Sequence, residues 1–103
     1  MRISQKTNKA STSETRIQIR KFDNKNFALW KEMMQDVLII RRQVKAIQHR
    51  EKPASMSAKE WRSLDKIACS SIWMHLTENV YFSIAKETTT VTLWEKLQAV
   101  YEK

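Results

Sequence analysis

The sequence predicts an all-α domain, a compact bundle of four to five short helices preceded by a basic flexible tail and a short extended arm. The 103 residues include no glycine and a single proline, Pro53, so turns must be built from Asn, Ser and Thr. Apolar residues recur mostly at the spacing of a helix rather than in strict alternation. The length fits one domain that buries most of its unfolded surface without disulfides.

The N-terminal segment is expected to lie outside the helical core. Residues 1–15 carry too few apolar side chains to offset the entropy of ordering, and they predict a disordered basic tail. Residues 16–22 alternate polar and apolar side chains, which is the period of an extended segment with one buried face. Because no second strand is evident, packing must hold this arm. The helical domain is therefore assigned to residues 16–103.

The first helix is predicted over about residues 27–42, after a turn. In that turn Asn24 is the expected position of a positive φ angle, and Asn26 is the expected N-cap. The apolar residues then follow the i, i+3, i+4, i+7 pattern of a buried face. The expected core residues of this helix are Phe27, Trp30, Met33, Met34, Val37 and Leu38. Residues 44–47 suggest one more short turn of helix.

Three further helices are predicted, over about residues 57–76, 78–86 and 90–102. Ser57 and Glu60 match a capping box at the start of the first of them. The expected inward residues are Trp61, Leu64, Ala68, Ile72, Leu76, Val80, Tyr81, Ile84, Trp94, Leu97 and Tyr101. A buried Trp is worth about 3–5 kcal/mol relative to Ala, so the tryptophans of the first and last helices are expected to mark where these helices meet.

The net charge of +8 is concentrated in the first half of the chain. Residues 1–52 contain 13 Lys or Arg against 5 Asp or Glu, whereas residues 53–103 contain 6 of each. Such basic patches can bind phosphate backbones by releasing counterions, which is salt-sensitive and independent of sequence. A solvated charged face is an equally good interpretation. The candidate RNA-contacting residues are Arg2, Lys6, Lys9, Arg41, Arg42, Lys45, Arg50 and Lys52.

No residues form a pattern typical of catalysis or metal binding. The sequence around Ser70 has no glycine elbow, and the acidic residues are scattered. His49 and His75 lie outside any metal-binding motif. Cys69 is the single cysteine, so we expect neither an internal disulfide nor a cysteine-based zinc site, and interpret it as a small half-buried residue. The sequence predicts a non-enzymatic protein without cofactor, metal or small-molecule substrate.

Targeting signals are also missing from the sequence. No apolar run approaches the roughly 20 residues that a membrane span requires, and the N-terminus lacks the apolar stretch of a signal peptide. We therefore expect no membrane partner and a cytoplasmic or nuclear location.

An ordered series of aromatic, apolar and turn positions covers about residues 20–103. Its members are Lys21-Phe22-Asp23, Asn26-Phe27, Trp30, Met33, Asp36-Val37-Leu38-Ile39, Lys52-Pro53, Met56-Ser57, Trp61, Leu64-Asp65, Ala68, Ser71-Ile72, Leu76, Val80, Leu93-Trp94-Glu95-Lys96-Leu97 and Tyr101. In order and spacing this series resembles the N-terminal Gag region of copia-type long-terminal-repeat retrotransposons. The resemblance implies an α-helical part of a capsid module that assembles with other copies into particles enclosing RNA.

The sequence departs from that family in three ways. Asn24 stands where the family often has glycine, a change that Asn tolerates because it also adopts left-handed angles. Trp73 stands where relatives tend to carry a polar or basic residue, and is expected to be a local contact or a position under no constraint. The second helical half and the Cys/His zinc knuckle of related proteins are not found, so the chain is expected to be a truncated copy with an incomplete set of assembly contacts.

The alternative interpretation is a small basic helical nucleic-acid-binding module unrelated to particle assembly, such as a Myb-like or helix-turn-helix domain. Net charge and multiple tryptophans favour it. However, successive Trp residues are 31, 12 and 21 positions apart, and no final helix gathers Lys and Arg as a recognition helix does. The sequence favours a structural protein that self-associates through helix faces and binds RNA without sequence preference.

Overall fold

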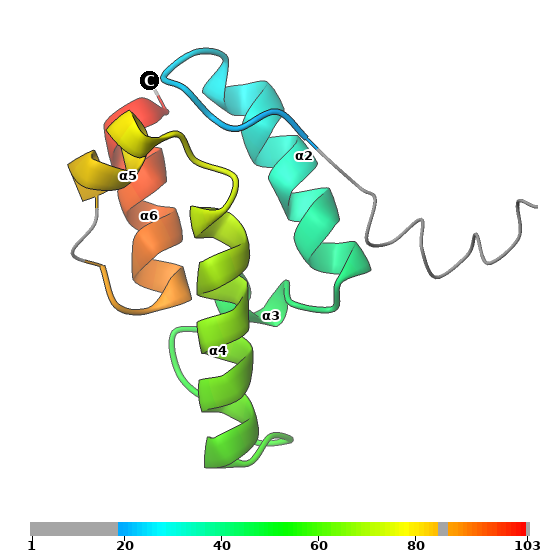
Figure 1. The fold of residues 1–103 in the computed structure, drawn as a ribbon. Coiled ribbons are helices and arrows are strands. Elements are labelled where there is room, and N and C mark those ends of the chain that lie inside the picture. The colour runs from blue at the N-terminus through cyan, green and yellow to red at the C-terminus, as the bar shows by residue number, and fades with distance from the viewer. Residues whose placement is uncertain (1–18, 85–86, 103) are drawn as a thin grey trace, which may run out of the picture.

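Five helices follow one another along the part of the chain that the computed structural model describes, residues 19–84 and 87–102 (Figure 1). They are α2 (Phe27–Ile40), α3 (Lys45–Gln48), α4 (Ala58–Trp73), α5 (Glu78–Ile84) and α6 (Thr90–Tyr101). The predicted all-α class is therefore confirmed. The predicted tail, residues 1–15, and the first part of the arm lie outside the described residues. None of the described helices is long and apolar enough to cross a membrane.

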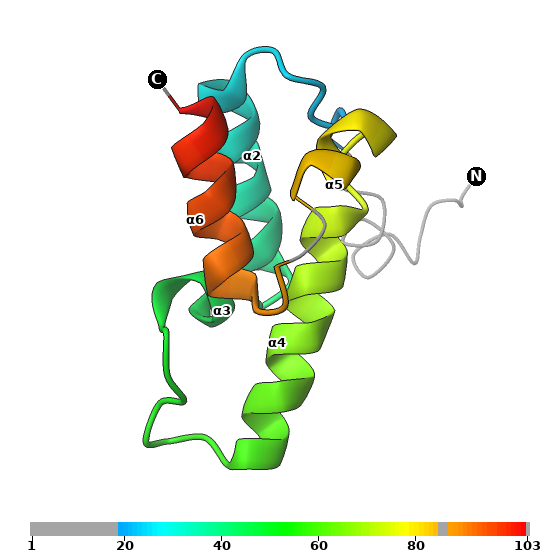
Figure 2. The same ribbon diagram turned by 90° about the vertical axis from the view of Figure 1, so that its left-hand side faces the viewer.

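The three longest helices, α2, α4 and α6, lie side by side, while α3 closes one end of the bundle (Figures 1 and 2). The N-terminal part of α4 extends beyond the other helices in both views, together with the loop before it. Trp61 lies in the first turn of α4, in this projecting part. It is only half-buried and lies outside the main core, which corrects its expected role as a core anchor.

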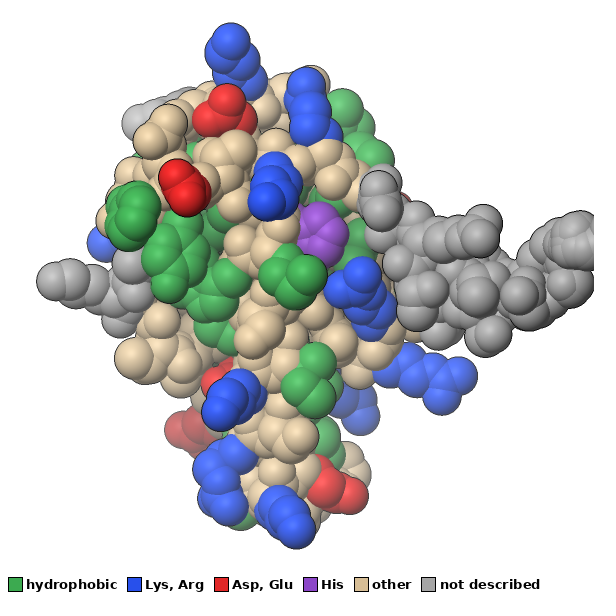
Figure 3. All heavy atoms as spheres, in the orientation of Figure 1, with side chains coloured by type: hydrophobic (Ala, Val, Ile, Leu, Met, Phe, Trp, Pro, Cys, Tyr) green, Lys and Arg blue, Asp and Glu red, His purple; other side chains and the backbone are tan. Residues whose placement is uncertain are grey.

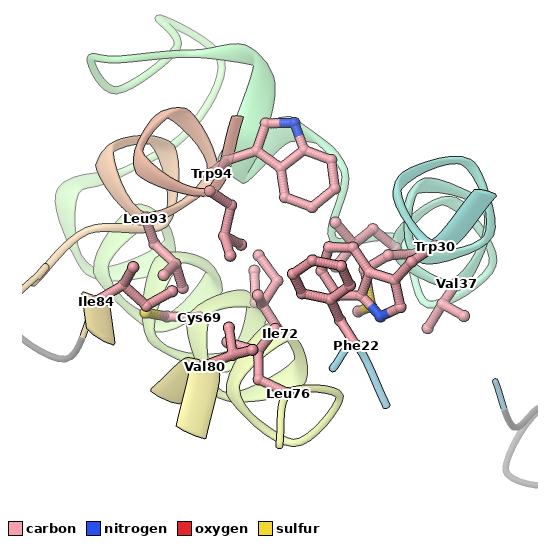
Figure 4. Close-up of a cluster of buried hydrophobic side chains, with 14 of the residues drawn as sticks. Phe22, Trp30, Val37, Cys69, Ile72, Leu76, Val80, Ile84, Leu93 and Trp94 are labelled. Atoms are coloured by element: carbon pink, nitrogen blue, oxygen red, sulfur yellow. The ribbon is translucent and has the colours of Figure 1, made fainter. Parts of the chain in front are cut away.

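One apolar core joins the arm to the helices, and side chains from α2, α4, α5 and α6 converge on it (Figure 4). Its buried members are Phe22, Phe27, Trp30, Met34, Val37, Leu38, Ala46, Ala68, Cys69, Ile72, Leu76, Val80, Ile84, Leu93, Trp94 and Leu97. The ring centroids of Trp30 and Trp94 are 6.0 Å apart, so the first and last long helices meet in this core. Leu64 and Tyr101 are half-buried and pack against its edge.

The buried face of α2 differs from the predicted one at Met33. Met34 is fully buried, whereas the side chain of Met33 is 38% exposed. The face that packs on α4 and α6 is centred between Trp30 and Met34, and Met33 lies to one side of it, toward the arm. The expectation that Met33 is a core anchor is therefore wrong.

The arm is held by packing and also by a short backbone pairing. The Phe22 amide donates to the His75 carbonyl oxygen at 2.8 Å, and the Thr77 amide donates to the Phe22 carbonyl oxygen at 3.1 Å. These bonds form an isolated parallel bridge between Phe22 and Leu76. Because residues around Leu76 pair with the arm, α4 ends at Trp73 rather than at Leu76 as predicted.

The turn between the arm and α2 uses two left-handed asparagines. Asn24 has φ 70°, which confirms the prediction for this residue, and Asn26 has φ 59° and ψ 52°. The Asn26 side chain makes no capping hydrogen bond. Asn26 is the N-cap residue of α2 as predicted, but the expected side-chain bond is absent because a side-chain cap normally requires extended backbone angles.

The predicted capping box of α4 is present, and α6 also begins with a side-chain cap. The Ser57 hydroxyl accepts a hydrogen bond from the Glu60 amide at 3.1 Å, and the Glu60 carboxylate accepts one from the Ser57 amide at 2.9 Å. At the start of α6 the Thr89 hydroxyl accepts from the Thr92 amide at 3.3 Å. Each cap satisfies backbone donors that would otherwise lack partners, and such caps contribute about 0.5–2 kcal/mol.

The start of α6 is also fixed to the middle of α4. The buried Thr90 donates its amide to the Asp65 carboxylate at 2.9 Å and its hydroxyl to the Asp65 carbonyl oxygen at 2.7 Å. Both polar groups of this buried threonine are therefore paired, as buried polar groups normally are.

The unusual Trp73 makes a local contact at the end of α4. It is half-buried against the core, and its ring centroid lies 4.5 Å from that of Tyr81 on α5. Tyr81 itself is exposed, so its expected inward orientation is wrong. The short α5 buries Val80 and Ile84, and Tyr81 lies at the edge of this buried face, against Trp73.

The two adjacent methionines of α2 provide a test of this packing. Met34→Ala should lower the free energy of unfolding by about 2–5 kcal/mol because it leaves a cavity in the core. Met33→Ala should change it by less than about 1 kcal/mol because that side chain is already partly solvated. Chemical denaturation of both variants checks this, and equal losses would contradict the assigned face.

Candidate nucleic-acid interface

The predicted RNA-contacting residues divide into those that the structure describes and those that it does not. Arg2, Lys6 and Lys9 lie outside the described residues. The other five follow α2 closely in sequence, but their side chains have different surroundings. These are Arg41, Arg42, Lys45, Arg50 and Lys52.

Arg42 and Lys45 line the same groove. Arg42 is an exposed residue with φ 61° in the turn after α2, and Lys45 is the exposed first residue of α3. The groove has a volume of about 510 Å³ and is completed by Val44, Ser55, Met56, Glu60 and Leu64. Neither cation makes a side-chain hydrogen bond or ion pair with the described residues. Both are therefore placed to meet phosphate groups, although Glu60 reduces the local positive potential.

Arg50 and Lys52 already have partners within the chain. Arg50 forms an ion pair and a hydrogen bond with Glu95 on α6, and the hydrogen bond to Glu95 raises the pKa of the Arg50 guanidinium. Lys52 donates to the Met56 carbonyl oxygen at 2.9 Å. Arg50 connects the loop between α3 and α4 to α6, and Lys52 makes a contact within that loop. Phosphate must compete with both contacts.

Arg41 is partly buried in a polar network between helices. Its guanidinium lies 3.5 Å from the Ser71 hydroxyl of α4, which donates to the Gln43 side-chain oxygen at 2.7 Å. Gln43 and Ser71 are both buried. Arg41 is therefore better placed to support the contact between α2 and α4 than to bind RNA.

Three cations on α4 extend the basic surface and were not among the predicted contacts. Lys59, Arg62 and Lys66 are exposed and spaced by three and four residues, so they follow one face of the helix. Lysine and arginine side chains gather over the lower part of α4 in Figure 3. Lys59 lines a second groove that shares Glu60 and Leu64 with the groove of Arg42 and Lys45. The net charge of residues 53–103 is zero, so counting charges did not identify these three cations. Their helical spacing could have identified them.

A second group of cations surrounds an apolar cleft between the arm and α2, here called the arm cleft. Arg20, Lys21 and Lys25 lie around it, and its volume is about 320 Å³. Its remaining lining consists of Phe22, Leu29, Trp30 and Met33. The indole N–H of Trp30 is buried and has no hydrogen-bond partner among the described residues. The arm cleft therefore combines positive charge with apolar surface.

The described residues include no group of three His, Cys, Asp or Glu side chains that could hold a metal ion. His75 is buried, and its Nδ1 lies 2.7 Å from the Ser71 carbonyl oxygen. Cys69 is buried in the core, and this burial raises the pKa of its thiol. A thiol with a raised pKa is a poor nucleophile at neutral pH because the thiolate is the reactive form.

The Cys69 thiol is expected to react slowly with a disulfide reagent such as dithionitrobenzoate at about pH 8, and quickly once denaturant unfolds the chain. The folded state keeps the thiol proton to higher pH than the unfolded state does. The free energy of unfolding should therefore fall as the pH rises above the ordinary thiol pKa, and fall less in Cys69→Ala. A native reaction rate equal to the denatured rate would contradict this burial.

The sequence is 33% identical over 91 residues to the "Retrovirus-related Pol polyprotein from transposon TNT 1-94" of Nicotiana tabacum, across 86% of this chain. The chain spans only 7% of the length of that polyprotein. No protein-family model matches the chain, and no solved structure matches it. The similarity agrees with the ordered series of residues described above, and the chain therefore belongs to the copia-type retrotransposon polyproteins, of which it represents one segment.

Proposed function

We propose that the chain is a non-enzymatic, Gag-like structural module that associates with other copies of itself and binds RNA without sequence preference. The observation that carries this proposal is the similarity to a retrotransposon polyprotein over 86% of the chain. Because the aligned segment is 7% of that polyprotein, activities of the whole protein do not transfer to it. A small helical domain with a basic surface fits a packaging role better than a catalytic one.

RNA binding is supported by the exposed cations around α3 and along α4. Arg42 and Lys45 face the same groove as the start of α4, and the exposed stripe Lys59, Arg62 and Lys66 continues from it along α4. Such a surface contacts phosphates rather than base edges, so it provides affinity without sequence preference. For single strands the logarithm of the affinity falls with the logarithm of salt by about 0.7 per neutralised phosphate.

Neutralising two cations of this surface should weaken RNA binding and its salt dependence. For Lys45→Gln/Arg62→Gln we expect a salt slope smaller by about 1.4, measured by fluorescence anisotropy of a labelled single-stranded RNA. The control is Lys31→Gln/Lys96→Gln, which removes the same charge elsewhere. Lys31 pairs with Glu102 at 2.8 Å, and Lys96 is exposed on α6.

Equal slopes for the two double variants would contradict this assignment of the surface. Tight binding to one duplex DNA sequence that survives physiological salt would instead favour the small nucleic-acid-binding module. The RNA and the duplex should therefore be compared at the same salt concentrations.

The self-association part predicts species heavier than the monomer that increase with protein concentration. Sedimentation velocity and electron microscopy of nuclease-treated protein, at low and high salt, should detect them. Association that persists at high salt indicates contacts between chains rather than bridging by RNA. A strict monomer at the highest concentrations reached would contradict self-association by this chain.

A further inference from the structure

An exposed aromatic patch lies at the junction of α4 and α5, and we call it the aromatic knob. Its members Phe82 and Met74 are 74% and 67% exposed, and Tyr81 is also exposed. The Tyr81 and Phe82 ring centroids lie 5.6 Å apart, so the two rings adjoin each other. Hydrophobic side chains gather over α5 at the left of Figure 3. Glu78, one turn before Phe82 on the same helix, adds a negative charge beside the patch.

The arm cleft has the complementary properties. Its floor is apolar and includes Leu29, which is 49% exposed. Its rim carries Arg20, Lys21 and Lys25, and these same cations line an adjoining cavity of about 350 Å³ with Asp23 and Thr77. An apolar floor beneath a positive rim suits an aromatic side chain that is accompanied by a carboxylate.

We propose that the aromatic knob of one chain docks into the arm cleft of another copy, with Phe82 on the apolar floor and Glu78 among the rim cations. This inference rests on the proposed self-association and names the surfaces that carry it. The occupant is a second copy because this chain itself presents an exposed ring and an acid together. Phe82 is exposed in this chain and does not line its own arm cleft, so the ring that fills the cleft must come from another copy.

The geometry of this contact determines the type of assembly. Because the knob and the cleft are different surfaces, each docked pair of chains still offers one free knob and one free cleft. Such head-to-tail contacts generate rings or open filaments rather than a closed two-fold dimer. A small contact centred on one aromatic side chain is expected to be weak. Tethering many copies to one RNA would then strengthen it through effective concentration.

Three exposed positions test the contact with little risk to folding. Phe82→Ser removes the knob, Leu29→Lys adds a cation to the cleft floor, and Ile39→Ser is the matched control. Ile39 is 54% exposed, lies on α2 like Leu29 and lines neither surface. We expect the first two variants to lower the self-association constant at least tenfold in sedimentation experiments, and the control to leave it unchanged.

Mixing the two defective variants gives the decisive result. Phe82→Ser keeps an intact cleft and Leu29→Lys keeps an intact knob, so a mixture should form one-to-one complexes and nothing larger. If Phe82→Ser abolishes association while Leu29→Lys has no effect, two knobs pack together and the proposal is wrong. It is also wrong if Lys25→Gln weakens RNA binding without affecting association, because the cleft is then an RNA surface.

The two proposals fail in distinguishable ways. A wild-type chain that stays monomeric overturns self-association and, with it, this contact. A wild-type chain that associates as strongly as Phe82→Ser and Leu29→Lys overturns the contact alone.

Discussion

The burial of Phe22 connects more of this molecule than any other single contact. Its ring centroid lies 5.2 Å from that of Phe27, 5.4 Å from Trp30 and 4.8 Å from Tyr101. Its backbone also pairs with the residues around Leu76. Phe22 therefore joins the arm, the start of α2 and the end of α6 in one aromatic cluster, and its backbone pairs with the segment after α4. This cluster requires the chain to reverse direction within four residues, and the left-handed asparagines of that turn make the reversal feasible.

The placement of the arm has consequences for the surface. Since Phe22 is held in the core, the cations on either side of it in sequence are fixed along the edge of α2, where they surround an apolar cleft. The pairing of the arm with Leu76 likewise ends α4 early and directs the chain into the short α5, whose outer side exposes aromatic rings. The same backbone bridge thus positions both surfaces of the proposed contact between copies. The proposed RNA surface lies on α3 and on the projecting part of α4, so the two proposed binding surfaces occupy different parts of the molecule.

Much of the architecture follows from sequence because it is local. Helical spacing, the Ser57 and Glu60 capping box and the positive φ angle of Asn24 depend on residues within a few positions of each other. The errors concern tertiary choices. Met33 and Met34 are both compatible with the stripe, and the way α2 packs into the shared core decides which is buried. The candidate RNA-contacting residues are less predictable. The sequence does not show that Arg50 pairs with Glu95 or that Lys52 donates to the Met56 carbonyl oxygen, because the fold brings these partners together. The arm cleft forms where the arm packs beside α2, and no local sequence pattern predicts that packing.

In the proposed assembly the α5 knob of one copy lies in the arm cleft of another. The most direct measurement is zero-length carbodiimide cross-linking of an equal mixture of ¹⁴N-labelled and ¹⁵N-labelled chains, followed by mass spectrometry. The proposed contact should give mixed-isotope peptides that join Glu78 to Lys21 or to Lys25 of the cleft rim. Cross-links between these residues found only within chains of one isotope, in a sample that sediments as oligomers, would contradict it.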